Sequence, residues 1–484
     1  MKKFLASIFA AAILLSNTTF AAEGMTLTLD EAIALALKNN RLIEQSTEER
    51  AAARWNLSAV RRSSGVTFRW SATLNRIGGR YYHSYRAQHR QAKGTPYENF
   101  YPSYESENAN TVSLSVPLYT GGQLENQREG ARYALNGADL SLENARQTVK
   151  YQAAAAYYQI LQQKSLVEVQ KQAVELLEEH LRHVTIQYEV GTVAKSDVLA
   201  TNVQLANSQQ NLNSAQGNYQ TAVAQLNNIL GLPVDTEIAT ASEINFARYD
   251  LTEADCLEYA LSHRPDGIAA AYAVKQAEAA TDAAKSGYRP RVNAVISGSA
   301  VGEGMFKADH TREHWSVGVE MSWNVFDNGV TSAQVEQYKA AERRAASVAR
   351  QQIEAIELEV RSAYINLKTA EKNIETTAAA VAKAEEEFSI AQIRYVEGVD
   401  TNLNVMNAQE KVVETRNNYY TALYNYNTGR AQLEKAMGVP VAIDALLYAD
   451  AEERGSSADK ALEAAAVNHG DYSLQSPADT PFDK

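Results

Sequence analysis

Few side chains in this sequence have the type and spacing to do chemistry. His180 and His183 are three residues apart in a stretch without proline, so a helix would place both imidazoles on one side, where they could bind a metal ion. No third ligand lies near them in the sequence, and we expect both histidines on a solvated helix face. The chain has no phosphate-binding glycine loop and no HExxH or GxSxG motif. We therefore expect neither an enzyme nor a bound metal or cofactor.

The composition of the 484 residues excludes several classes of protein. The 46 Lys and Arg against 58 Asp and Glu give a net charge of −12, which argues against nucleic acid as a partner because phosphate binding needs a cationic surface. Hydrophobic residues make up 45%, too many for a disordered or collagen-like chain, and 24 Gly with 9 Pro are too few for many short strands and turns. The single cysteine, Cys256, cannot form an internal disulfide, and we expect it to be a small buried hydrophobe.

The first 21 residues have the pattern of a secretion signal. Lys2 and Lys3 precede an apolar run from Phe4 to Leu15, and small residues around Ala21 suit cleavage. A run of about 12 apolar residues is too short to span a bilayer, so a retained membrane helix is the weaker alternative. We expect residues 1–21 to be a signal peptide of an exported protein.

The rest of the chain contains an internal duplication. A shift of 207 residues aligns Val116–Pro233 with Trp323–Pro440 without a gap, and upstream the shift becomes 224, which indicates a 17-residue insertion within segment 77–110. We expect a first repeat over residues 22–230, a second over 231–440, and a C-terminal equatorial segment with a flexible tail over 441–484. Identical pairs include Gly122/Gly329, Tyr157/Tyr364, Tyr188/Tyr395, Gly191/Gly398, Gly231/Gly438 and Pro233/Pro440.

Each repeat contains two segments in which apolar and polar residues alternate. In the first repeat, Phe68, Trp70 and Leu74 alternate with polar residues. In the second repeat, Val317 and Val319 do the same. Period two over about ten residues is typical of a strand with one lipid-facing and one wet side, although a soluble sheet with one solvated face has the same pattern. The predicted strands lie at about 65–76, 110–119, 290–300 and 314–326.

Each second strand is followed by a long helix and a shorter one. The predicted helices are 123–190 and 195–230 in the first repeat and 330–397 and 402–437 in the second, and the long ones reach about 100 Å. A soluble coiled-coil hairpin is the alternative for these helices alone, but it leaves the strands unexplained. Apolar residues recur every seven positions, and a second stripe of small residues indicates neighbours on both sides, as in a ring of helices. The stripes are Ala153, Ile160, Val167, Val174, Leu181 and Tyr188; Val360, Leu367, Ile374, Val381, Phe388 and Tyr395; and Ala363, Ala370, Ala384 and Ala391.

Four strands cannot close a membrane barrel, because bacterial outer-membrane barrels need at least about eight. The protomers must then share one barrel. Two copies would give eight strands, whose interior side chains tend to fill, whereas three copies give twelve strands with a lumen and twelve helix strands in a ring. The three-copy arrangement would be a mixed α and β trimer with a 12-stranded transmembrane β-barrel, four strands per protomer, continued by an α-helical coiled-coil barrel that carries solutes.

The order of elements and several motifs resemble the TolC family of outer-membrane efflux proteins over roughly residues 26–440. The resemblance implies a homotrimer in outer-membrane lipid with a large periplasmic extension and an equatorial girdle from 231–285 and 438–484. It implies a passive exit duct of a tripartite efflux or type I secretion system, joined through a periplasmic adaptor protein to an inner-membrane pump that supplies the energy. The motifs are Tyr188–Gly191 running into Asp197–Leu199, Tyr395–Gly398, the turn Leu118–Gly122, and Tyr288–Val292.

The resemblance also identifies candidate site residues at the periplasmic entrance. In the family's best-known members two aspartates one helical turn apart narrow this entrance, and the matching residues here are Asn404 and Asn407. Asp197 is the first-repeat counterpart of Asn404, and Asp400 lies nearer the tip. We expect these four residues to form the constriction, with asparagine rings that carry no formal charge. Capping or cross-linking of the hairpin by the asparagines is the alternative.

Two turns and one loop complete the candidates. By resemblance the turns contact the adaptor, although their glycines also end helices. The insertion in segment 77–110 is the longer outward loop; its aromatic and arginine residues would contact surface glycans or phosphates, fold over the pore mouth, or simply pack at the interface. The turn residues are Val190, Gly191 and Thr192, and Glu397, Gly398 and Val399; the loop tyrosines are Tyr81, Tyr82, Tyr85 and Tyr101.

Two other functions are compatible with parts of the pattern. A trimeric, envelope-spanning coiled coil for structure or adhesion would use the helices, but adhesin stalks usually run one way and need no duplicated hairpin. A general diffusion porin would use the strands, but porins need no helices of about 100 Å. The export duct accounts for both kinds of element, and we take it as the leading hypothesis.

Overall fold

The computed structural model describes residues 25–76, 79–96, 106–241, 243–303 and 313–441. The chain divides into two compact units: a sheet unit of residues 48–141 and 266–353, and a hairpin unit that takes the described parts of 1–47, 142–265 and 354–484. Each unit draws on both sequence repeats, so the repeats are not the compact units. The predicted signal peptide over 1–21 and all but the first residue of the predicted segment 441–484 lie outside the described residues.

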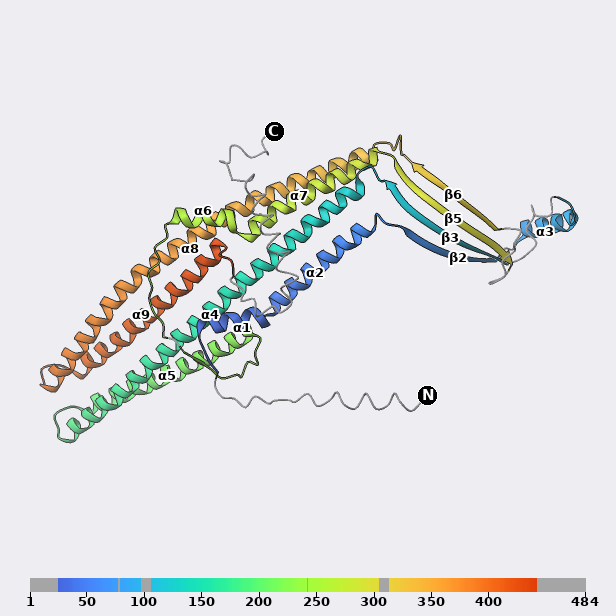
Figure 1. Cartoon of the computed structure of the whole chain (residues 1–484). Helices are drawn as coiled ribbons and strands as arrows, with labels where there is room; N and C mark the ends of the chain where they lie inside the picture. Colours follow the sequence, from blue (N-terminus) through green and yellow to red (C-terminus); the bar gives the residue numbers. More distant parts are fainter. Residues whose placement is uncertain (1–24, 77–78, 97–105, 242, 304–312, 442–484) are drawn as a thin grey trace, which may run out of the picture. The chain divides into compact units, whose positions relative to one another are not determined.

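The sheet unit contains one four-stranded antiparallel sheet in the order β2-β3-β5-β6 (Figure 1). The pairing of β3 with β5 joins the two repeats into a single sheet. The edge strands β2 and β6 are exposed along their whole length. The strands are β2 Thr67–Arg76, β3 Ser106–Tyr119, β5 Arg291–Glu303 and β6 Glu313–Ser322.

The register of this sheet lines up the alternating residues in rows. Because directly paired residues share a face, Phe68, Leu114, Ile296 and Val317 form an apolar row across all four strands. The neighbouring row, which faces the other side, is Arg69, Ser113, Ser297 and Ser316. The sheet therefore has one apolar and one polar face, as the period-two pattern predicts.

Strand β6 ends earlier than the sequence pattern predicts. The predicted strand continues to about residue 326, but pairing stops at Ser322. The indole of Trp323 instead donates to the carbonyl of Tyr288 at 3.1 Å, and the amide of Val325 bonds back to Trp323. A local turn thus replaces the last predicted residues of the strand.

The helices of the sheet unit contact one another, and the turn after β3 contacts Arg289. The ring of Tyr133 stacks on that of Tyr272 with centroids 6.0 Å apart, and the Thr281 hydroxyl donates to Glu342 at 2.8 Å. Gly121 has a φ of +68°, its carbonyl accepts from Arg289 at 3.1 Å, and an added Cβ would lie 2.9 Å from the Arg289 side chain. The turn after β3 therefore requires glycine. The helices with residues in this unit are α2 Arg41–Arg62, α3 Arg80–Ala92, α4 Gln123–Glu189, α7 Pro265–Lys285 and α8 Val330–Val396, with a 3-10 turn over Ser286–Tyr288.

The hairpin unit shows the duplication most directly. Helices α4 and α8 have 67 residues each, and α5 and α9 have 36 each. Capping boxes begin both α1, at Thr28 and Glu31, and α6, at Thr252 and Asp255, which are 224 residues apart. Helix α1 contacts α5 as α6 contacts α9. The other elements are β1 Met25–Leu27, α1 Leu29–Asn39, α5 Lys195–Leu230, β4 Ile238–Thr240, α6 Glu253–His263 and α9 Asn402–Met437, with β1 parallel to β4.

The core of the hairpin unit contains most of the predicted heptad residues. Cys256 is fully buried there, as expected for a small hydrophobe. Tyr188, the last residue of the first stripe, is instead 42% exposed, while its repeat partner Tyr395 is 8% exposed. Residues 266–285 of the predicted equatorial girdle belong to the sheet unit, as helix α7. No helix within the described residues is long and apolar enough to cross a membrane. Buried stripe residues are Ala153, Ile160, Val174, Val360, Leu367, Ile374, Tyr395, Ala363, Ala370, Ala384 and Ala391.

Candidate functional site at the helix-hairpin tips

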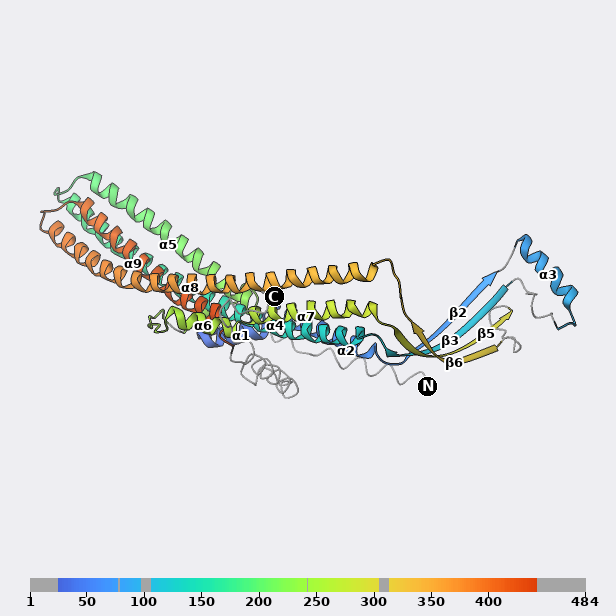
Figure 2. The ribbon, with the colours of Figure 1, turned by 90° about the horizontal axis from the view of Figure 1, so that it is seen from above.

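Each repeat places a helical hairpin in the hairpin unit (Figures 1 and 2). The two connecting turns have the same backbone geometry. Gly191 and Gly398 have φ values of +79° and +72°. Each glycine N–H bonds to the carbonyl three residues earlier, and the next N–H bonds five residues back, which satisfies the free carbonyls at the helix end. A Cβ at either glycine would meet nothing within 4 Å, so the positive φ alone selects glycine.

The turn residues proposed for adaptor contact are all exposed in the single chain. Val190 and Val399 are 69% and 66% exposed, and Gly191, Thr192, Glu397 and Gly398 are exposed beside them. Exposed valines at a helix end cost free energy in water, since about 25 cal/mol is lost for each Å² of apolar surface left uncovered. Each tip thus carries one exposed valine beside its glycine turn.

A small apolar cluster joins the two hairpins just behind the turns. Val184 of α4 is fully buried against Tyr395 of α8 and Val405 of α9. The cluster also includes Ala391 and Ala408, with Phe388, Val193 and Val198 packed around it.

A hydrogen-bond network crosses the same contact. The buried Asn402 donates through Nδ2 to the carbonyl of Asp197 at 3.2 Å and to the hydroxyl of Thr201 at 3.0 Å. Its Oδ1 lies 2.6 Å from Nε2 of His180. Because the amide nitrogen already serves two acceptors, Oδ1 must accept, and Nε2 of His180 carries the proton. Asn402 thereby connects α9 to both helices of the first hairpin.

His180 is therefore not the solvated residue that the sequence suggests. Its ring lies 5.4 Å from that of Tyr395, whose hydroxyl donates to Oε1 of Gln187 at 2.7 Å. Burial lowers the pKa of His180, the bond to Asn402 opposes this shift, and the nearby His183 adds to it. His183 itself is exposed, as expected. Asn402 is 222 residues from His180, and no local sequence signal connects the two.

Asp400 and Asn404 bond to each other within the α8–α9 turn. Nδ2 of Asn404 donates to Asp400 at 2.5 Å, and the backbone N–H of Thr401 donates to the same oxygen at 2.8 Å. Arg394 lies 3.6 Å from the other carboxylate oxygen. The bond from Asn404, followed by those from Thr401, lowers the pKa of Asp400, so it stays charged. The Thr401 hydroxyl also accepts from the N–H of Asn404 and caps α9.

The two counterpart positions, Asp197 and Asn404, differ in their surroundings. Asp197 is half-buried in the first turn of α5, whose N-cap Ala194 makes no side-chain bond, and its backbone carbonyl accepts from Asn402. Asn404 is exposed and bonded across its own turn. The bond from Asn404 to Asp400 stays within the turn before α9, a local contact of the capping kind that is the alternative to a constriction role.

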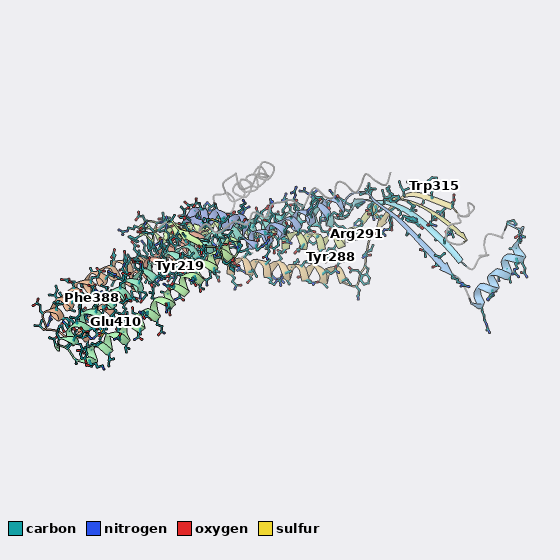
Figure 3. The ribbon with its side chains drawn as sticks, turned by 90° about the horizontal axis from the view of Figure 1, so that it is seen from below. Tyr219, Tyr288, Arg291, Trp315, Phe388 and Glu410 are labelled. Carbon is teal, nitrogen blue, oxygen red and sulfur yellow. The ribbon has the colours of Figure 1, made fainter. Side chains whose placement is uncertain are left out.

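Helices α8 and α9 enclose a groove of about 610 Å³ that brings three of the candidates together. Asp400, Asn404 and Asn407 line it, and Lys411 bonds to Glu387 across it at 2.8 Å. Figure 3 shows Phe388 on α8 and Glu410 on α9 near this end of the unit. Within the described residues no group of three or more His, Cys, Asp or Glu is placed to hold a metal ion. The other lining residues are Ile390, Ala391, Arg394, Ala408, Glu410 and Glu414.

The sequence profile of the outer membrane efflux proteins matches residues 32–232 and 256–439, which is most of the chain. This protein belongs to the outer membrane efflux protein family. The predicted family is confirmed, and with it the outer-membrane location, the large periplasmic extension and the export function.

Relatives and solved structures agree with this membership. The outer membrane efflux protein BepC of Brucella suis is 25% identical over 418 residues, 84% of each chain. The outer membrane protein TolC of Escherichia coli is 22% identical over 368 residues, 71% of this chain and 72% of TolC. The Campylobacter jejuni CmeC outer membrane channel has a TM-score of 0.74 at 17% identity and covers 90% of this chain and 89% of its own. The mostly helical fold with some strands is thus the fold of outer-membrane efflux channels.

Proposed function

We propose that this protein is the exit duct of a tripartite efflux or type I secretion system and works as a homotrimer. One observation carries the proposal: four strands form a sheet with an apolar and a polar face and exposed edge strands, in the same chain as helices of 67 residues. Such a sheet covers its edges by pairing with other copies. A passive duct of this kind catalyses no reaction and takes its energy from the pump.

Three copies would close a 12-stranded barrel. The strands alternate in direction from β2 to β6, so β6 of one protomer can pair antiparallel with β2 of the next all the way around. The apolar row with Phe68 and Val317 would face lipid, and the row with Arg69 and Ser316 would face the lumen. In the same trimer the helices of the hairpin units would form the periplasmic α-barrel.

The hairpin tips are the proposed entrance and adaptor contact. Three-fold symmetry would turn Asn404, Asn407, Asp400 and Asp197 into rings around the axis. The exposed turns at Gly191 and Gly398, with the groove between α8 and α9, would receive the adaptor, and the adaptor would connect the duct to an inner-membrane pump.

Relatives with different cargo support a general export role. The toluene efflux pump outer membrane protein TtgI of Pseudomonas putida is 24% identical over 312 residues, and the alkaline protease secretion protein AprF of Pseudomonas aeruginosa is 23% identical over 344 residues. Their names indicate a small apolar molecule in one case and a polypeptide in the other. We propose that the cargo here is of one of these two classes.

Growth with and without the protein tests the proposal. A deletion strain should become sensitive to dyes, bile salts or antibiotics, or should retain a secreted polypeptide, and the wild-type gene should restore the phenotype. A Gly398→Leu variant should assemble but fail to restore it, because a side chain at φ +72° strains the turn by about 1 kcal/mol and protrudes from the tip. Gly217→Leu, within α5 and also without atoms near its Cβ position, is the matched control and should behave as wild type.

The outcomes separate the duct from its alternatives. An envelope-spacing or adhesive coiled coil would leave sensitivity and secretion unchanged on deletion while altering adhesion or envelope spacing. If the Gly398→Leu variant lost its trimer to the same extent as its export, the turn would serve folding and not adaptor contact.

A further inference from the structure

Helix α3, Arg80–Ala92, is the described part of the insertion that the first repeat has and the second lacks. It follows β2 and precedes β3, at the ends of these strands that are remote from α4. It begins at Gly79 with a φ of +94°, and no side chain caps it. Because the second repeat pairs its own strands, β5 and β6, without the 17 inserted residues, the insertion is not needed to build the sheet.

The length of β2 fixes where α3 starts. Ten residues at about 3.3 Å, tilted by about 45°, give a height of about 23 Å, close to the apolar band of about 25 Å in outer-membrane barrels. Arg76, the last residue of β2, is then at the membrane surface on the outer side. Only four Cα steps separate Arg76 from Arg80, so α3 begins within about 15 Å of the strand end. The first turn of α3 therefore lies in, or just above, the headgroup layer.

The charge of α3 is opposite to that of the whole chain. Arg80, Arg86, Arg90 and Lys93 fall within residues 77–97, which contain no Asp or Glu, whereas the chain has a net charge of −12. Arg80 and Arg90 are exposed, as is Lys93 at the C-cap. At 100° per residue the positions of Arg80 and Arg90 lie about 80° apart around the helix axis, so these two exposed cations fall on one side of the helix.

We propose that α3 lies on the outer leaflet of the outer membrane and binds the phosphate groups of its glycolipid headgroups. Guanidinium groups pair with phosphate oxygens in two parallel hydrogen bonds, and a basic helix at an interface is attracted to anionic lipid. The sequence of the helix also contains three tyrosines, a residue type enriched at membrane interfaces. The partner is lipid-borne phosphate, since the strand end holds the helix at the height of the headgroups.

Lipid retention by the full-length protein in detergent tests this proposal. Native mass spectrometry would count bound bisphosphorylated lipid A, with dephosphorylated lipid A and inorganic phosphate as the other two probes. Removing three exposed cations, as Arg80→Gln, Arg90→Gln and Lys93→Gln together, should weaken binding of the bisphosphorylated lipid by about fivefold for each charge. The matched control removes three exposed cations elsewhere in the sheet unit, as Arg61→Gln, Arg62→Gln and Arg344→Gln, and should bind as wild type.

Each result bears on the proposal. Arg80→Lys with Arg90→Lys keeps the charge and should retain most of the binding, which separates loss of charge from loss of fold. Equal retention by the wild type and the three-glutamine variant would overturn the proposal, as would equal binding of dephosphorylated lipid A. Complete displacement of the lipid by inorganic phosphate would assign the helix to free phosphate and would also overturn it.

Discussion

At the scale of single residues, His180 is the group whose charge state most directly affects the contact between the hairpins. Its proton at Nε2 serves Asn402, and Asn402 in turn joins α9 to Asp197 and Thr201. A second proton on the half-buried ring would introduce an uncompensated charge next to Tyr395. We therefore expect the contact between the hairpins to be sensitive to pH.

The direction of that sensitivity follows from the lowered pKa of His180. The unfolded tip binds a proton near the ordinary histidine pKa of about 6.5, whereas the folded tip resists it, so stability is full above about pH 6.5 and falls as the pH drops. Hydrogen exchange at residues 180–190 and 395–408 should become faster, after correction for intrinsic rates, between about pH 7.5 and 5.5.

Two glutamine variants separate His180 from its neighbour. His180→Gln keeps an N–H donor for Asn402 without a titrating group, and it should flatten the pH dependence. His183→Gln, on the exposed residue one turn away, should leave the dependence as in the wild type. A pH dependence that persists in His180→Gln would show that another group controls the tip.

Asn404 and Asn407 give a second prediction at the residue scale. Rings of asparagine carry no formal charge, and the carboxylate of Asp400 is already bonded to Asn404 and close to Arg394. Single-channel recordings should therefore show weak block by multivalent cations. Asn404→Asp with Asn407→Asp should strengthen the block by about tenfold or more, because an acidic ring concentrates counter-ions.

The contrary result is equally clear. Strong block in the wild type that survives Asp197→Ala and Asp400→Ala would contradict an uncharged entrance.

At the scale of elements, the sheet has two faces that should tolerate charge differently. Val317 is in the apolar row in the middle of β6, and Ser316 is its neighbour on the polar face. Val317→Arg would put a charge against lipid and should destabilise the folded protein in membranes by about 2–4 kcal/mol. Ser316→Arg is the matched control and should cost far less. Denaturant unfolding in lipid vesicles measures both; equal losses would mean that the sheet does not have one lipid-facing side.

Also at this scale, the hairpins diverged after duplication while keeping their lengths. The same stripe position ends as the exposed Tyr188 in one hairpin and as the buried Tyr395 in the other. Tyr395 takes the buried place because Gln187 and His180 of the first hairpin provide its hydrogen-bond partner and ring contact. Only one of the two equivalent tyrosines occupies the contact between the hairpins. Tyr395 occupies it, and Tyr188 stays exposed.

At the scale of the whole molecule, the edges of the sheet predict how copies assemble. Ser71→Cys on β2 and Ser316→Cys on β6 place thiols on the polar face of the two edge strands, and the native Cys256 is buried. Within one sheet β2 and β6 are about 14 Å apart, so a shorter bifunctional maleimide should link different protomers and give covalent trimers on a denaturing gel. Each single variant is a control and should stay monomeric. A detergent-purified protein that gives no linked species would contradict the shared barrel.

The sequence by itself determined the features that depend on residues close together in the chain, namely the strands, the long helices and the turns. The two-residue period predicted the strands, the seven-residue step predicted the long helices, and Gly191 and Gly398 marked both turns. Such predictions are possible because backbone geometry repeats along a single element. The duplication followed from alignment alone, and the family followed from these patterns together. Helix α3 was missed because this basic, tyrosine-rich segment contains none of the Leu, Ile and Val residues that marked the other helices.

The tertiary structure alone decided which distant residues meet. The bond between His180 and Asn402 spans 222 positions, and the register of β3 with β5 joins strands from different repeats. The division into a sheet unit and a hairpin unit cuts across both repeats for the same reason. Contacts of this kind depend on how whole helices and strands pack, and a local pattern fixes which face of an element is apolar but not which partner covers it.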